Sequence, residues 1–263
     1  MVALSKDLNK NTEIKIFSDL QDLFQTAAND FAQRAINAVN TKGIFNVALS
    51  GGNTPKYLFD ILATKKQILK QIPWRNINFF LTDERYVPDN NPESNYDMMN
   101  KHLFSKIDIN TENIYKIPTD YTHPKDAAED YTATLRKIFD INHNEFPKFD
   151  LVYLGLGEDA HTASLMPFSN ALDIDYKNNQ LVESLWVPKL RQYRITLTAP
   201  AINQAACIIF LVTGANKASA VRSILEGSFE PQRYPAQLIH CVHGKTIWYL
   251  DHAAAEKLRG IET

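Results

Sequence analysis

Short runs of apolar, β-branched residues alternate with amphipathic stretches along this chain. The first amphipathic stretch has apolar side chains three and four residues apart between Leu20 and Ile36, which predicts a helix that ends at Gly43. Further helical spacing occurs over residues 55–69, 95–104 and 125–141. The strand-like runs are residues 44–49, 77–81, 149–156, 181–187, 193–197, 207–212 and 246–250.

This alternation predicts an α/β fold with a doubly wound, mainly parallel sheet and helices on both faces, as in Rossmann-like proteins. Strands separated by helical segments pair in parallel through right-handed crossovers. Several of the runs are apolar at every position, as a sheet covered on both faces requires. No internal repeat or linker divides the chain, so we expect a single domain over residues 1–263. In such sheets ligands bind beyond the carboxyl ends of the strands.

Composition and charge exclude several classes of protein. The 263 residues include 28 Lys and Arg against 30 Asp and Glu, a net charge of −2, without the basic excess of nucleic-acid binders. The longest apolar run, residues 205–212, is far shorter than the roughly 20 residues of a membrane span. We expect no secretory signal, because charged residues come before any long apolar stretch, and two cysteines are too few for a disulfide framework. We expect a cytoplasmic protein with neither nucleic-acid nor membrane partners.

A glycine-containing turn follows the strand predicted at residues 44–49. It consists of Ser50, Gly51, Gly52, Asn53 and Thr54, and Pro55 then opens a helix. Free backbone N–H groups and the helix dipole favour an anion there, most simply a phosphate. A tight strand-to-helix turn without a ligand is the alternative. The turn lacks the lysine of a Walker loop and the glycine spacing of a dinucleotide fingerprint.

Charged residues follow the strand predicted at residues 77–81. Asp83, Glu84 and Arg85 stand in a row, which indicates either a solvated turn or a carboxylate and a guanidinium at the mouth of a site. Ser94 and Asn95 are placed to cap the next helix, a role that needs no function to explain it.

A histidine follows the strand predicted at residues 149–156. His161 comes after two glycines, Gly155 and Gly157, and Asp159 lies two residues before it. Histidine is the side chain whose ordinary pKa lies between 5 and 8, so it suits general base catalysis. A structural histidine is the alternative.

Two more cations follow later strands. Arg194 and Lys217 are either surface charges or, together with the glycine turn, a phosphate clamp. No nucleophile elbow of the form Gly-x-Ser-x-Gly is present. His240, Cys241 and His243 do not have the spacing of a zinc site, so we expect no metal.

Together these motifs resemble the 6-phosphogluconolactonase family. The resemblance covers roughly residues 15–255 and is carried, in order, by residues 50–55 (SGGNTP), 83–88 (DERYVP), 94–95 (SN), 155–165 (GLGEDAHTASL), 194–198 (RITLT), 212–217 (VTGANK) and 243–248. The related glucosamine-6-phosphate isomerase/deaminase family shares the glycine turn but resembles the chain less well. That family continues its histidine motif with IAFNEP where residues 162–167 read TASLMP.

The resemblance implies a doubly wound α/β fold and hydrolysis of 6-phospho-D-glucono-1,5-lactone in the pentose phosphate pathway, without a cofactor. It implies His161 as the base that activates water, Asp159 as its orienting partner and Arg85 as a ligand of substrate oxygens, and it leaves the role of Asp83 open. The phosphate ligands implied are Ser50, Gly51, Gly52, Asn53, Thr54, Arg194 and Lys217. We expect a monomer or small homo-oligomer. The alternatives are a glucosamine-6-phosphate isomerase/deaminase and a non-enzymatic sugar-phosphate sensor.

The chain departs from the family's pattern at two positions. The family usually has a small residue where Asn53 stands, and Asp-Gly-His where the chain reads Asp159, Ala160 and His161. If that glycine adopts a positive φ, Ala160 is strained by about 1 kcal/mol or more. This departure puts the shape of the loop in question, while His161 is retained.

Overall fold

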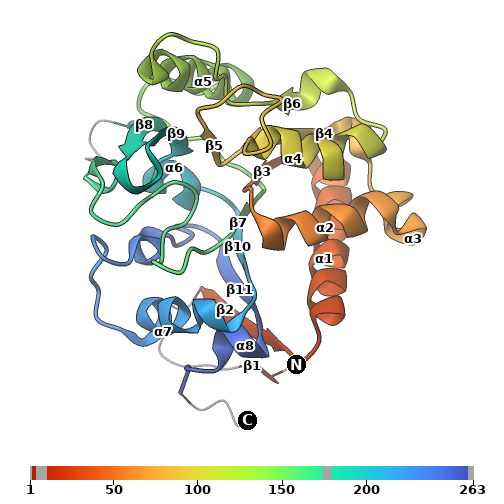
Figure 1. Cartoon of the computed structure of the whole chain (residues 1–263). Helices are drawn as coiled ribbons and strands as arrows, with labels where there is room; N and C mark the ends of the chain where they lie inside the picture. The colour runs from red at the N-terminus through yellow and green to blue at the C-terminus, as the bar shows by residue number, and fades with distance from the viewer. Residues whose placement is uncertain (1, 4–10, 174–178, 260–263) are drawn as a thin grey trace.

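The computed structural model describes residues 2–3, 11–173 and 179–259, and in this part of the chain the main sheet has eight strands (Figure 1). Their order is β1-β2-β11-β10-β7-β3-β4-β6, and all neighbours pair in parallel except β1 with β2. The strands are β1 (Val2–Ala3), β2 (Thr12–Phe17), β3 (Phe45–Leu49), β4 (Ile77–Leu81), β6 (Ile114–Tyr115), β7 (Leu151–Leu154), β10 (Cys207–Val212) and β11 (Lys245–Asp251). The predicted doubly wound, mainly parallel sheet is confirmed.

Helices cover both faces of the main sheet. In Figure 1, α1 and α2 lie on one side of the central strands, and α6 and α7 lie on the other. β7 and β10 are buried at every position, which accounts for their continuous apolar sequence. The helices are α1 (Leu20–Lys42), α2 (Asn53–Thr64), α3 (Lys66–Leu69), α4 (Asn95–His102), α5 (Pro124–Phe139), α6 (Ala199–Asn203), α7 (Ala218–Glu226) and α8 (His252–Ala255).

Local sequence sets where the helices begin and end. The side chain of Asp19 caps α1, and Gly43 ends it with φ 81°, as the sequence predicts. The helix predicted at residues 55–69 is instead divided into α2 and α3, because Lys65 between them has an extended backbone with ψ 100°. No helix among the described ranges is both long enough and apolar enough to cross a membrane.

A second, antiparallel sheet stands beside the main sheet. It pairs β5 (Asp83–Arg85) with β9 (Gln192–Leu197), and β9 with β8 (Val182–Val187). The runs at residues 181–187 and 193–197 are therefore strands as predicted, but they lie outside the parallel sheet. Residues 83–85, for which the sequence left open a solvated turn or charged groups at the mouth of a site, form an edge strand of this small sheet.

The strand order places a crevice at one point of the main sheet. From β3 the chain proceeds outward through β4 to β6, whereas from β7 it proceeds in the opposite direction through β10 to β11. Ligands bind where such an order reverses, beyond the carboxyl ends of the two strands. Here those ends are Leu49 of β3 and Leu154 of β7, which precede the glycine turn (residues 50–54) and the histidine loop (residues 155–165).

Candidate active site

A cavity of about 450 Å³ occupies this crevice. It is lined by the segments that follow β3, β4, β7 and β10, including Arg85 of β5, together with Arg194 of β9. Of the residues predicted for the site, it brings together Ser50, Gly51, Gly52, Asn53, Thr54, Asp83, Arg85, His161, Arg194 and Lys217. Asp159 does not line the cavity, but it contacts His161 directly.

The glycine turn presents free N–H groups at the start of α2. Among the described residues, no hydrogen-bond acceptor pairs with the N–H of Gly51 or Gly52. Gly52 has φ 111°, a conformation that favours glycine, and the first turn of α2 contains no acidic side chain. The turn therefore has the unpaired donors and the dipole of an anion site.

Ser50 anchors this turn rather than offering its hydroxyl to a ligand. Its Oγ donates to the carbonyl oxygen of Tyr153 over 2.9 Å and lies 2.6 Å from Oγ1 of Thr82. Because this buried hydroxyl already contacts both the Tyr153 carbonyl and the Thr82 hydroxyl, Ser50 offers its backbone N–H rather than its side chain to a bound phosphate.

His161 and Asp159 form a hydrogen-bonded pair at the edge of the cavity. Nδ1 of His161 lies 2.6 Å from Oδ1 of Asp159, and this hydrogen bond lowers the pKa of the Asp159 carboxyl to about 2, against the effect of its partial burial. An ionised carboxylate is only an acceptor, so Nδ1 carries the proton and Nε2 is left with a free lone pair. Nothing in the described part of the chain hydrogen-bonds Nε2.

The loop around this pair has an unusual backbone. Ala160 has φ 66°, so the strain expected from its place in the motif is present. Gly157 is needed for space, because a Cβ there would lie 2.1 Å from Nδ1 of His161. The N–H of Gly157 donates to the carbonyl oxygen of His161 over 2.8 Å, which closes the loop beneath the imidazole.

Two guanidinium groups face each other across the small sheet. Arg85 of β5 and Arg194 of β9 are paired in register, and Nε of each is buried without a partner among the described residues. Burial, and next the charge of Arg85, lowers the pKa of Arg194. Like charges directly opposite each other destabilise a sheet, so this pair indicates a site that binds an anion.

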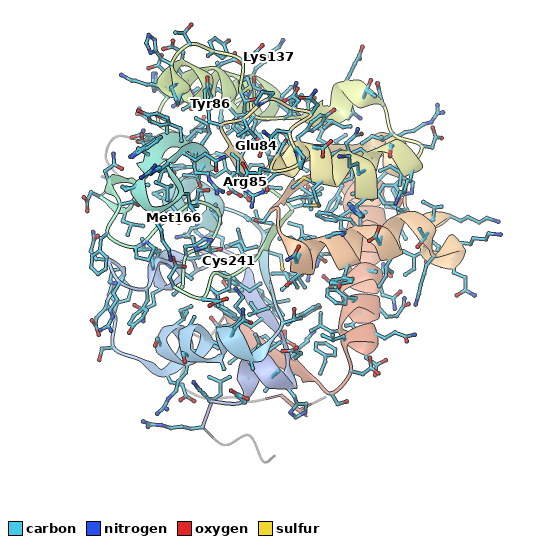
Figure 2. All side chains as sticks on the ribbon, in the orientation of Figure 1. Glu84, Arg85, Tyr86, Lys137, Met166 and Cys241 are labelled. Carbon is cyan, nitrogen blue, oxygen red and sulfur yellow. The ribbon has the colours of Figure 1, made fainter. Side chains whose placement is uncertain are left out.

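Two neighbouring carboxylates hold the Arg85 strand in place. Asp83 is buried and accepts hydrogen bonds from Ser164 (2.7 Å) and Thr82 (3.1 Å), so it braces the loops on either side of the cavity. Glu84 points to the start of α4 and accepts from the backbone N–H groups of Arg85, Asn95 and Tyr96. Figure 2 shows Glu84 and Arg85 between α4 and the small sheet.

Sequence reasoning missed several residues of the cavity wall. Ser94 is the helix cap as predicted, but Asn95 turns its side chain toward the glycine turn. Tyr57 of α2 forms part of the wall and is 60% exposed. Glu158 and Asn216 join two loops at the rim through a 2.6 Å hydrogen bond. These side chains come from segments far apart in the sequence, and no spacing in the sequence indicates that they meet.

The described residues hold no cluster of three or more His, Cys, Asp or Glu side chains suited to a metal ion. Cys241, in the motif that lacks zinc spacing, is buried and directs its thiol to the carbonyl oxygens of Ala205 and Lys245.

Comparison with known proteins identifies relatives over almost the whole length. The family described as glucosamine-6-phosphate isomerases/6-phosphogluconolactonase matches residues 18–248. A 6-phosphogluconolactonase of Synechocystis is 38% identical over 247 residues, which cover 94% of this chain and 98% of that protein. These matches span both the glycine turn and the histidine loop.

Solved structures agree with this result. The crystal structure of devB protein superposes with a TM-score of 0.84 at 35% identity, over 94% of this chain and 99% of that one. A 6-phosphogluconolactonase of Trypanosoma brucei gives 0.82 at 27% identity, over 95% and 99%. A monomeric glucosamine-6-phosphate deaminase, at 20% identity and a TM-score of 0.73 over 93% and 99%, shows the shared fold alone.

Proposed function

Because the chain belongs to the glucosamine-6-phosphate isomerase/6-phosphogluconolactonase family, we propose a route by which this cavity hydrolyses its substrate. The activity is that of a 6-phosphogluconolactonase, a lactone hydrolase of the pentose phosphate pathway, and the substrate is a sugar-phosphate lactone. One observation supports this route above all: the imidazole of His161, with its ionised partner Asp159, and the glycine turn lie at the same cavity.

The phosphate of the substrate binds at the glycine turn. The N–H groups of Gly51, Gly52, Asn53 and Thr54 donate to its oxygens, and the dipole of α2 favours its charge. The side chains of Arg194 and Lys217 complete the clamp from β9 and from the loop after β10. The phosphate does not react, and its binding energy orients the lactone ring against His161.

His161 then activates water. Nε2 removes a proton from a water molecule as its oxygen attacks the lactone carbonyl, which gives a tetrahedral intermediate. The bond between the carbonyl carbon and the ring oxygen breaks, and the imidazolium returns the proton to that oxygen. The product is a single open-chain molecule that carries both the released hydroxyl group and a carboxylic acid, which ionises in water. General base and acid catalysis of this kind contributes about 10²–10⁴-fold.

Charged neighbours stabilise the charges that develop during this reaction. Asp159 holds the Nδ1–H tautomer and stabilises the imidazolium, as an ionised carboxylate beside a histidine does. Arg85 supports the negative charge that develops on the lactone oxygen, because its guanidinium lines the cavity and Nε lacks a partner among the described residues.

An acid-release assay tests this function. The protein is added to freshly generated 6-phosphogluconolactone below neutral pH, where spontaneous opening is slow, and proton release is followed with and without protein. Rapid protein-dependent acid release is expected, and glucosamine 6-phosphate should yield no ammonia in a parallel assay. Ammonia release without lactone hydrolysis would identify an isomerase/deaminase, and binding without turnover would identify a sensor.

We propose a cytoplasmic monomer or small homo-oligomer that folds as a single domain over residues 1–263 and uses no cofactor. Gel filtration with light scattering determines the oligomeric state directly.

A further inference from the structure

Asn95 lies behind the phosphate-binding turn, at the first position of α4. It is 1% exposed, and its Nδ2 donates to the carbonyl oxygen of Asp83 over 2.8 Å. Its backbone N–H donates to Oε1 of Glu84 over 2.7 Å. Asn95 is therefore held against β5 by both its side chain and its backbone.

The other side of this carboxamide faces Gly51. A Cβ added at Gly51 would lie 1.8 Å from Oδ1 and 2.3 Å from Cγ of Asn95, and the three nearest atoms all belong to Asn95. The φ of Gly51 lies outside the left-handed region, so other residues could adopt this backbone. Gly51 is thus required by the position of Asn95, whereas Gly52 is required by its φ of 111°.

Oδ1 of Asn95 makes no hydrogen bond that would explain its position. It is buried, and no donor among the described residues reaches it. A buried acceptor without a partner is destabilising, so a native one needs another explanation. Oδ1 lies against Gly51, and the carboxamide fills the space between Gly51 and Asp83.

We propose that Asn95 is a positioning residue whose carboxamide sets the distance between the glycine turn and β5. The turn carries the N–H groups of Gly51 and Gly52, and β5 carries Arg85, so Asn95 fixes these anion-binding groups relative to one another. The identity of the anion as the substrate's phosphate rests on the proposed function. The contact between Asn95 and Gly51 does not.

The first test compares two substrates. Asn95→Ala should raise KM for 6-phosphogluconolactone about tenfold and change kcat less than about threefold, because the glycine turn loses its contact with Asn95 while β5 and Arg85 remain paired with β9. For unphosphorylated glucono-1,5-lactone, kcat/KM should change less than about threefold. Asn100→Ala, on the same helix but away from the cavity wall, is the matched control. An unchanged KM, or equal losses for both substrates, would overturn the proposal.

The second test is a double-mutant cycle. Gly51→Ala should lower kcat/KM about 100-fold or more and weaken binding of inorganic phosphate, because its methyl group collides with the carboxamide. The double variant Gly51→Ala/Asn95→Ala removes that collision and should recover at least about tenfold in kcat/KM. It should also have a higher thermal midpoint than Gly51→Ala. If Gly51→Ala does not fold, recovery of folded protein in the double variant is the same positive result.

These readouts separate failure of the inference from failure of the proposed function. A wild-type protein that does not hydrolyse the lactone contradicts the proposed function, while the thermal midpoints still test the contact. A wild-type protein that hydrolyses it, with no recovery of activity or stability in the double variant, contradicts the role of Asn95.

Discussion

At the scale of single residues, the arrangement around His161 depends on the charge of its neighbour. The 2.6 Å contact with Asp159 fixes the imidazole and leaves Nε2 free to face the cavity. Ala160 between them retains a positive φ at a cost of about 1 kcal/mol, which indicates that the surrounding loop determines its conformation.

Replacing Asp159 by Asn tests this dependence. Asn keeps a similar shape but loses the negative charge that stabilises the imidazolium, so kcat should fall about 10- to 100-fold, with KM little changed. The partial exposure of Asp159 limits the effect. Asp89→Asn, which removes a surface ion pair with Lys116 away from the cavity wall, is the control. A kcat equal to that of wild type would exclude an electrostatic role for Asp159.

We expect Arg194 to destabilise the folded protein while it binds the phosphate of the substrate. Arg194→Met should leave the free energy of unfolding unchanged or raise it by about 1 kcal/mol, because the like charge opposite Arg85 is removed. KM for the phosphorylated lactone should rise about 10- to 100-fold through loss of a charge-assisted hydrogen bond. Urea unfolding and steady-state kinetics measure the two effects. Equal losses on phosphorylated and unphosphorylated lactone would contradict a phosphate contact.

At the scale of elements, the short strand β5 connects the site to the rest of the fold. Its three residues bring Arg85 to the cavity, Asp83 to the loop after His161 and Glu84 to the start of α4. Burial raises the pKa of Glu84 to about 7, although three backbone N–H groups lower it. Because the Glu84 carboxyl joins β5 to the start of α4, its protonation affects how firmly this strand is held.

The stability contributed by Glu84 should fall as pH rises. Between its ordinary pKa of 4.5 and about 7, the unfolded chain releases the proton and the folded chain keeps it, so folding becomes less favourable with increasing pH. Over this pH range the free energy of unfolding falls by up to about 3 kcal/mol. The free energy of unfolding is measured for wild type and for Glu84→Gln at pH 5 and at pH 7.5. The difference between the two proteins at each pH removes the contribution of the other titratable groups. A difference independent of pH would contradict the assignment.

Sequence patterns predicted some elements better than others, for identifiable reasons. β4 and β10 are predicted with the correct bounds because most of their side chains are apolar and buried, and a polar residue, Thr82 or Thr213, follows each strand. β5 has the sequence Asp-Glu-Arg, and its pairing with β9 joins residues more than 100 positions apart, which no local period reveals. The helix break at Lys65 was missed because the apolar spacing continues across it.

At the scale of the whole molecule, the site exists because distant segments meet at the reversal of strand order. The motifs at residues 50–55 and 155–165 could each be recognised in the sequence, and the rule for doubly wound sheets placed them at one edge. The contact of Asn95 with Gly51 and the opposition of Arg85 and Arg194 depend on tertiary packing, so they could not be predicted. Both arise where the small sheet meets the main one.

The two sheets should unfold together. α5 packs on the small sheet, and its Tyr131 hydroxyl hydrogen-bonds both backbone groups of Leu81 at the end of β4, so the same helix holds both sheets. A variant with Trp74 and Trp248 replaced by Phe leaves Trp186 of β8 as a fluorescent probe of the small sheet. Its urea midpoint should equal the midpoint from far-UV circular dichroism. Two separate midpoints would show two independently folding units.

We infer that His161 performs the chemistry in a cavity whose glycine turn holds the phosphate. One variant with two readouts tests this inference: kcat of His161→Ala on 6-phosphogluconolactone, corrected for spontaneous opening, and the affinity of the same variant for the product 6-phosphogluconate. We predict a fall in kcat of about 10²–10⁴-fold, with the dissociation constant of the product within about threefold of wild type. An unchanged kcat would exclude His161 as the base that activates water.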